Sequence, residues 1–71
     1  MKASEVKPGE CYRTQNNWVR YVENIEDGKV RYRSRGATFT AGWTTSESFQ
    51  YQKLQMFAFD VIERVEENWQ A

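Results

Sequence analysis

The residues best suited to chemistry are cations that alternate along one short segment. Every second residue from position 29 to position 35 is a lysine or an arginine, so in an extended strand these side chains project on one face: Lys29, Arg31, Arg33 and Arg35. We expect Trp18 and Arg20 to join the same face from the preceding strand. Guanidinium groups bind phosphates and an indole can stack on a base. This cationic face is therefore a candidate anion or nucleic-acid site.

Two other interpretations fit the same cations. The acidic residues Glu63, Glu66 and Glu67 could lie over the face and neutralise it, either within the chain or from a partner. The cations could also form a solvated strand edge, where charge discourages edge-to-edge aggregation. The charge distribution allows each interpretation, because residues 1–35 hold eight Lys or Arg against five Asp or Glu, residues 36–71 hold two against five, and the formal net charge is zero.

A β-hairpin must position the cationic face. Asp27-Gly28 lies between two runs rich in β-branched and aromatic residues, and it favours a type I′ turn because that turn needs positive φ at both central residues. The resulting register predicts that Glu26 lies opposite Lys29 and that Arg20 lies opposite Arg35, a like-charge pair. One face of this hairpin is predicted to enter the core: Val19, Tyr21, Ile25, Val30 and Tyr32. Val22 and Asn24 are predicted to lie on the other face, with the cations.

The composition offers little for catalysis or metal binding. The chain has no histidine and a single cysteine, Cys11, so neither an internal disulfide nor a cysteine-based zinc site can form. We expect a protein that is not an enzyme and that needs no cofactor and no metal. Cys11 is expected to be a buried thiol; the alternative is a thiolate stabilised by Arg13 on the same strand face.

For a chain with a single cysteine, we expect a soluble protein in a reducing compartment such as the cytoplasm. The longest apolar run covers residues 56–59. A membrane span needs about 20 such residues, so no membrane partner is expected.

The other expected elements are short. A polar lead-in over residues 1–9 ends at the turn dipeptide Pro8-Gly9, and a strand follows over Glu10–Thr14. Gln15-Asn16-Asn17 is typical of a turn. Beyond Gly36, strand-like segments are expected over Ala37–Thr44, with a bulge or bend at Gly42, and over Ser46–Gln52.

The end of the chain combines helical and strand-like spacing. Apolar residues from Leu54 to Val65 fall on one helical stripe, yet the last of them are β-branched and alternate with charge. We expect a short helix over Leu54–Val61 and a closing strand over Ile62–Glu66, followed by a tail over residues 67–71. Together these elements predict a mainly β fold in one domain: a small SH3-like barrel of about five strands, with a short helix before the last strand.

The segment from Leu54 to Val65, LQMFAFDVIERV, resembles the closing segment of the plasmid-borne type II dihydrofolate reductases. Those enzymes are small SH3-like chains that assemble as tetramers around a central pore. The resemblance covers about a dozen residues and implies architecture. The segments KPGECYRT, VRYV and IEDGKVRY resemble short uncharacterised bacterial proteins with an SH3-like barrel, and they carry no function with them.

The reductase resemblance also implies a pore surface. In those enzymes a Gln-hydrophobic-Tyr stretch lines the pore, and Gln55, Met56 and Phe57 stand at the matching positions, with Phe57 lacking the tyrosine hydroxyl. Trp69, near the end of the chain, is expected in the core or at a subunit contact. Gln55, Phe57 and Trp69 are therefore the candidate oligomer or pore surface.

The sequence favours a small, non-enzymatic binding or interaction module, with a protein partner or a second copy of the chain as its most natural ligand. Aromatic residues make up 15% of the chain, and a domain of this size without disulfides gains from such large side chains or from a subunit contact. Nucleic-acid binding by the cationic face is the first alternative. A pore-forming oligomer that binds a small ligand near Gln55-Phe57 is the second.

Overall fold

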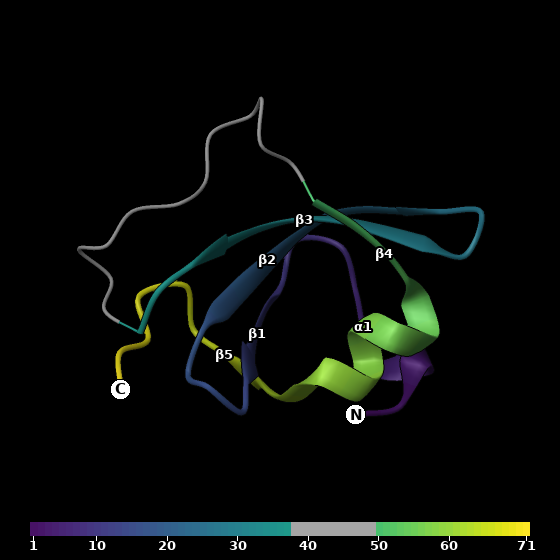
Figure 1. Cartoon of the computed structure of the whole chain (residues 1–71). Coiled ribbons are helices and arrows are strands. Elements are labelled where there is room, and N and C mark those ends of the chain that lie inside the picture. Colours follow the sequence, from purple (N-terminus) through teal and green to yellow (C-terminus); the bar gives the residue numbers. More distant parts are fainter. Residues whose placement is uncertain (38–49) are drawn as a thin grey trace.

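The chain folds around one antiparallel sheet. The computed structural model describes residues 1–37 and 50–71, and Figure 1 shows their arrangement. In chain order the elements are the 3-10 helix η1 (Ala3–Glu5), β1 (Cys11–Thr14), β2 (Val19–Glu26), β3 (Lys29–Arg35), β4 (Gln50–Lys53), α1 (Leu54–Asp60) and β5 (Val61–Val65).

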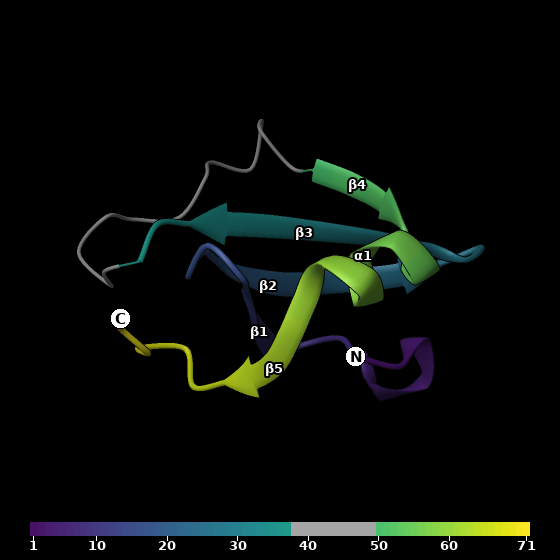
Figure 2. The same ribbon diagram turned by 60° about the horizontal axis from the view of Figure 1, so that its bottom comes forward.

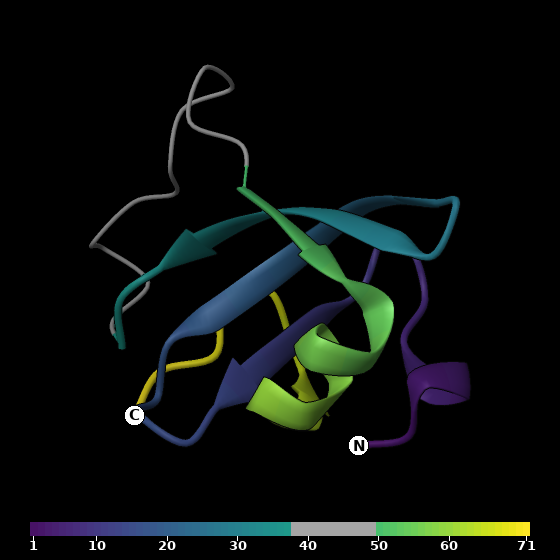
Figure 3. The same cartoon turned by 45° about the vertical axis from the view of Figure 1, so that its right-hand side comes forward.

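The strand order explains how so short a chain encloses a core. The five strands form one sheet in the order β4-β3-β2-β1-β5, and each neighbouring pair is antiparallel. Figures 2 and 3 show the sheet curling so that α1 lies between its two outer strands, β4 and β5. The prediction of a small mainly β fold, with five strands and a short helix before the last, is confirmed.

The β2–β3 hairpin forms at the predicted turn but shifts register along its length. Asp27 and Gly28 both have positive φ, 53° and 73°, as a type I′ turn requires. Glu26 lies opposite Lys29, as predicted, but the register shifts between Val22 and Asn24. Beyond this bulge, Arg20 lies opposite Ser34 and Arg35 opposite Val19, so the predicted Arg20–Arg35 pair does not form.

The bulge changes which side chains enter the core. Val22, predicted on the cationic face, is fully buried with Val30 and Tyr32 in the cluster on the inner side of the sheet, here called the inner cluster. Val19 is buried as predicted, but it lies with Cys11 and Val65 in a second cluster, here called the outer cluster, against which Tyr21 and Trp69 pack. Ile25 is only partly buried at the margin of the inner cluster. One extra residue in a strand turns the following side chains to the opposite face.

The inner cluster is built around the ring of Phe57. The ring lies edge-on to Tyr32, with centroids 5.1 Å apart, and to Tyr12, at 6.1 Å. Phe57 and Ala58 are the buried residues of α1, a seven-residue helix with no side-chain hydrogen bond at its N-cap. Because isolated helices of this length are not stable in water, the packing of Phe57 holds α1 in place.

The predicted boundaries near the end of the chain are wrong by one residue. The helix ends at Asp60 and the last strand runs over Val61–Val65, so Val61 belongs to β5 and Glu66 lies outside it. Of the expected strand over Ser46–Gln52, residues 50–52 lie in β4. The expected strand over Ala37–Thr44 and its bulge at Gly42 lie almost wholly outside the described residues.

The residues before β1 pack against α1. The amino group of Met1 donates hydrogen bonds to the carbonyl oxygens of Ala58 (2.9 Å) and Val61 (3.2 Å), at the C-terminal end of the helix. The hydroxyl of Tyr12 accepts a hydrogen bond from the backbone N–H of Lys7 at 2.7 Å. These contacts place η1 beside α1 (Figure 2).

Two phenylalanines of α1 provide a matched test of this packing. Phe57 is fully buried and Phe59 is 82% exposed. We expect Phe57→Ala to lower the free energy of unfolding by about 3–5 kcal/mol, because it empties the centre of the core. Phe59→Ala should change it by less than about 0.5 kcal/mol. Urea unfolding followed by circular dichroism measures both, and equal losses would contradict this account of the core.

Candidate functional site

The bulge in β2 divides the predicted cationic face between the two sides of the sheet. Arg20 lies opposite Ser34 and points to the inner side, where its guanidinium stacks over the ring of Tyr32. Lys29, Arg31, Arg33 and Arg35 alternate with the inward-facing residues of β3 and so lie on the outer side. The expectation that Trp18 and Arg20 share a face with these residues is therefore wrong, because it rested on an uninterrupted register.

Arg33 and Arg35 are both engaged within the protein. Nε of Arg33 lies 2.7 Å from a carboxylate oxygen of Glu23, the residue at the bulge. Arg35 is 1% exposed, and its guanidinium donates hydrogen bonds to the carbonyl oxygens of Gly36 (3.2 Å), Glu67 (2.8 Å) and Trp69 (2.6 Å). Arg35 thus holds residues 67 and 69 of the tail against the end of β3. Because its side chain is buried, it cannot form part of an exposed cationic face.

The acidic residues of the second half engage arginines through several separate contacts. The carboxylate of Glu63 forms an ion pair with Arg13, and Glu66 lies 3.5 Å from Arg64. Glu67 reaches Arg35 through its backbone carbonyl. Glu67 also lines a small pocket with Arg33, so one of the three acidic residues lies beside the cations of β3, as the charge-pairing interpretation expected.

Cys11 lies in the outer cluster as a buried free thiol. Burial, assisted by the negative charge of Glu67, raises the pKa of the thiol to about 11. Arg13, the expected stabiliser of a thiolate, instead lies 5.5 Å from the centroid of the Trp69 ring and pairs with Glu63. The environment therefore holds Cys11 in its neutral form at physiological pH.

The inner side of the sheet carries a groove beside α1. Its volume is about 530 Å³. Two exposed aromatic side chains contribute to it: Trp18, immediately before β2, is 50% exposed, and Phe59, near the end of α1, is 82% exposed. The other lining residues among those described are Thr14, Gln15, Asn16, Arg20, Ser34, Gln50 and Asp60.

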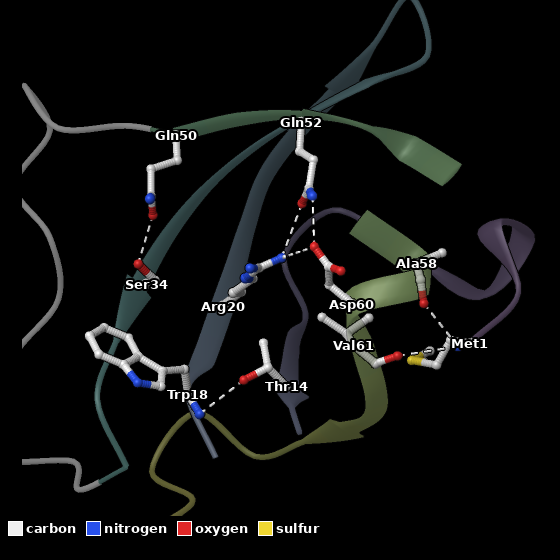
Figure 4. A network of polar contacts seen from close by, with 10 residues as sticks. All are labelled: Met1, Thr14, Trp18, Arg20, Ser34, Gln50, Gln52, Ala58, Asp60 and Val61. Atoms are coloured by element: carbon white, nitrogen blue, oxygen red, sulfur yellow. Dashed lines mark hydrogen bonds and ion pairs between the residues drawn. The ribbon is translucent and has the colours of Figure 1, made fainter. Parts of the chain in front are cut away.

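Two lining residues of the groove, Arg20 and Asp60, form a polar network with Gln52 (Figure 4). Arg20 donates a hydrogen bond to Oε1 of Gln52 at 3.0 Å, and Nε2 of Gln52 donates to Oδ2 of Asp60 at 2.7 Å. The guanidinium of Arg20 lies 3.6 Å from the same carboxylate oxygen. The charges of Arg20 and Asp60 therefore compensate one another within the protein.

Backbone geometry at the β1–β2 turn presents Trp18. Asn17 adopts a positive φ of 64°, and the backbone N–H of Trp18 donates to the hydroxyl of Thr14 at 3.2 Å. Across the groove, the hydroxyl of Ser34 donates to Oε1 of Gln50 at 2.7 Å (Figure 4). The groove thus combines exposed apolar rings with neutral hydroxyl and amide groups.

The residues proposed for an oligomer or pore surface do not gather on one surface. Phe57 is fully buried in the core, so its expected exposure on a pore surface is wrong. Gln55 and Met56 are exposed on α1. Trp69 packs against the outer cluster of Cys11, Val19 and Val65, on the opposite side of the sheet.

The described residues contain no group of three or more Cys, Asp or Glu side chains arranged to hold a metal ion. Neither helix in the described part of the chain is long and apolar enough to cross a membrane.

No protein-family model matches the chain, and comparison with the curated proteins and with the solved structures gives no significant match. The resemblance to SH3-like bacterial proteins and reductases therefore stays a prediction.

Sequence reasoning missed Phe59, Asp60 and Gln52 as site residues. Phe59 does not belong to the helical stripe that includes Phe57, and this was a signal that its ring would be exposed. Nothing in the sequence indicates that Asp60 meets Arg20, since the two residues are separated by forty positions and meet only through the packing of α1.

Alkylation measures the state of Cys11. At pH 8 we expect iodoacetamide to react with the folded protein at least about a hundredfold more slowly than with the urea-unfolded chain, because a pKa raised from 9.0 to about 11 leaves that much less thiolate. The rate should rise as the pH approaches 11. Equal rates in the folded and unfolded chains would show an accessible, activated thiolate.

Replacement of Arg35 tests the attachment of the tail. We expect Arg35→Lys to lower the free energy of unfolding by about 2–3 kcal/mol, because one ammonium cannot reproduce the spread of hydrogen bonds that a guanidinium donates. Arg64→Lys is the control, since Arg64 is exposed and its ion pairs contribute little. Urea unfolding distinguishes the two, and no loss in Arg35→Lys would contradict the assignment.

Proposed function

We propose that this protein is a small binding module that holds an extended peptide segment of a partner protein in the groove between Trp18 and Phe59. The observation that carries the proposal is the pair of exposed aromatic rings on a groove whose other described lining groups are neutral or charge-compensated. Exposed aromatic side chains of this kind anchor protein ligands.

The polar groups of the groove suit a peptide backbone. Peptides present both N–H donors and carbonyl acceptors, and the amide and hydroxyl groups of Asn16, Gln50 and Ser34 can supply both kinds of partner. Of the nine lining residues that the structure describes, five are exposed. A small molecule usually has most of its surface buried in its site. A groove as open as this one therefore suits a longer ligand.

The same contacts give less support to nucleic-acid binding. Arg20 is paired with Asp60, Arg33 with Glu23, and Arg35 is enclosed by carbonyl oxygens. Phosphate recognition depends on cations that are free to displace counterions. The buried free thiol of Cys11 supports a location in a reducing compartment such as the cytoplasm. Self-association of the chain stays a prediction, which sedimentation can test.

Binding to an array of random peptides of about ten residues tests the proposal. We expect a subset of these peptides to bind the native protein and to lose about tenfold or more in affinity with Trp18→Ser and with Phe59→Ser. Tyr51→Ser is the matched control, because Tyr51 is also an exposed aromatic residue but lines a separate pocket with Lys29 and Arg31.

Labelled oligonucleotides at about 50 and 200 mM salt form the competing arm. The proposal fails if no peptide binds, if the groove variants bind peptides as the native protein does, or if only oligonucleotides bind and their affinity falls steeply with salt.

A further inference from the structure

Among the described residues that line the groove, Asp60 is the only carboxylate. Its side chain is 36% exposed. Oδ2 accepts the hydrogen bond from Gln52 and lies 3.6 Å from Arg20, whereas Oδ1 contacts no partner among the described residues. Asp60 is also the last residue of α1, at the helix end where the backbone carbonyls disfavour a negative charge. This carboxylate can therefore gain from a second cation.

Arg20 is much less accessible to a ligand. Its guanidinium lies 4.9 Å from the centroid of Tyr32 and 5.5 Å from that of Phe57, and its side chain is 19% exposed. Its hydrogen bond to Gln52 further fixes its position. Arg20 is thus held within the protein, and the more exposed charge belongs to Asp60.

The exposed rings on the groove favour the same sign of ligand charge. Trp18 and Phe59 line the groove together with Asp60, and the face of an aromatic ring attracts a cation through its quadrupole. An acidic ligand group would meet the electron-rich ring faces and the Asp60 carboxylate. A basic group gains from both.

We infer that the groove selects a peptide segment with a basic side chain, arginine or lysine, whose cationic group contacts Asp60 beside the rings of Trp18 and Phe59. This inference rests on the proposed peptide-binding function and adds the charge of the residue that is recognised.

The test uses peptides of about ten residues that bind the native protein, each made with Arg, Gln or Glu at the central contact position. Isothermal titration should show the Arg peptide binding about tenfold more tightly than the Gln peptide, and the Glu peptide more weakly still, as a cation–ring contact and an exposed ion pair together allow. Asp60→Asn should reduce this preference, measured as the ratio of the Arg-peptide to the Gln-peptide affinity of the same variant, to about threefold or less.

Asp27→Asn is the matched control. It makes the same charge change at the hairpin turn, outside the groove, and asparagine tolerates the positive φ found there. Phe59→Leu is a second variant that keeps an apolar side chain at an exposed position, and it should lower the Arg preference by about two- to fivefold.

The outcomes separate the two proposals. If no peptide binds, both fail. If peptides bind in the groove with no preference for Arg, or with a preference for Glu, the inference alone is overturned. If the Arg preference persists in Asp60→Asn but is lost in Asp27→Asn, the recognised cation lies at the hairpin turn and the inference is wrong.

Discussion

The ring of Phe57 is the contact on which the rest of the structure depends. It joins α1 to β1 and β3 through Tyr12 and Tyr32, and a seven-residue helix needs such packing to stay formed. The position of α1 in turn places Asp60 within reach of Arg20 and Gln52, and leaves Phe59 on the solvent side. One face of α1 therefore packs in the core, and the other face lines the groove.

The bulge in β2 is the second constraint, and it explains why the two faces of the sheet differ. By turning Val22 inward and Val19 outward, it gives the sheet apolar residues on both sides. The outer cluster is then covered by Trp69 and by the tail that Arg35 holds. As a result the arginines of β2 and β3 serve different purposes on different sides. Arg20 supports the groove, and Arg35 closes the outer cluster.

Local sequence signals predicted most of the fold and little of the site. The turn at Asp27-Gly28 and the helical stripe from Leu54 depend on neighbouring residues, so they could be recognised directly. The bulge has no comparable signal, because the residue at the bulge is Glu23 and neither a glycine nor a proline marks the position. Since the predicted register did not include the bulge, it placed Arg20 on the wrong face. Trp18, Phe59 and Gln50 line the groove from the β1–β2 connection, α1 and β4, and only tertiary packing brings them together.

The mode by which Arg35 holds the tail has a consequence for sequence variation. The guanidinium binds backbone carbonyl oxygens of Glu67 and Trp69, and every amino acid supplies such an oxygen. These hydrogen bonds therefore place a stricter requirement on position 35 than on the side chain of residue 67. A substitution at residue 67 keeps the carbonyl acceptor, whereas the loss of Arg35 removes the donor for both bonds to the tail.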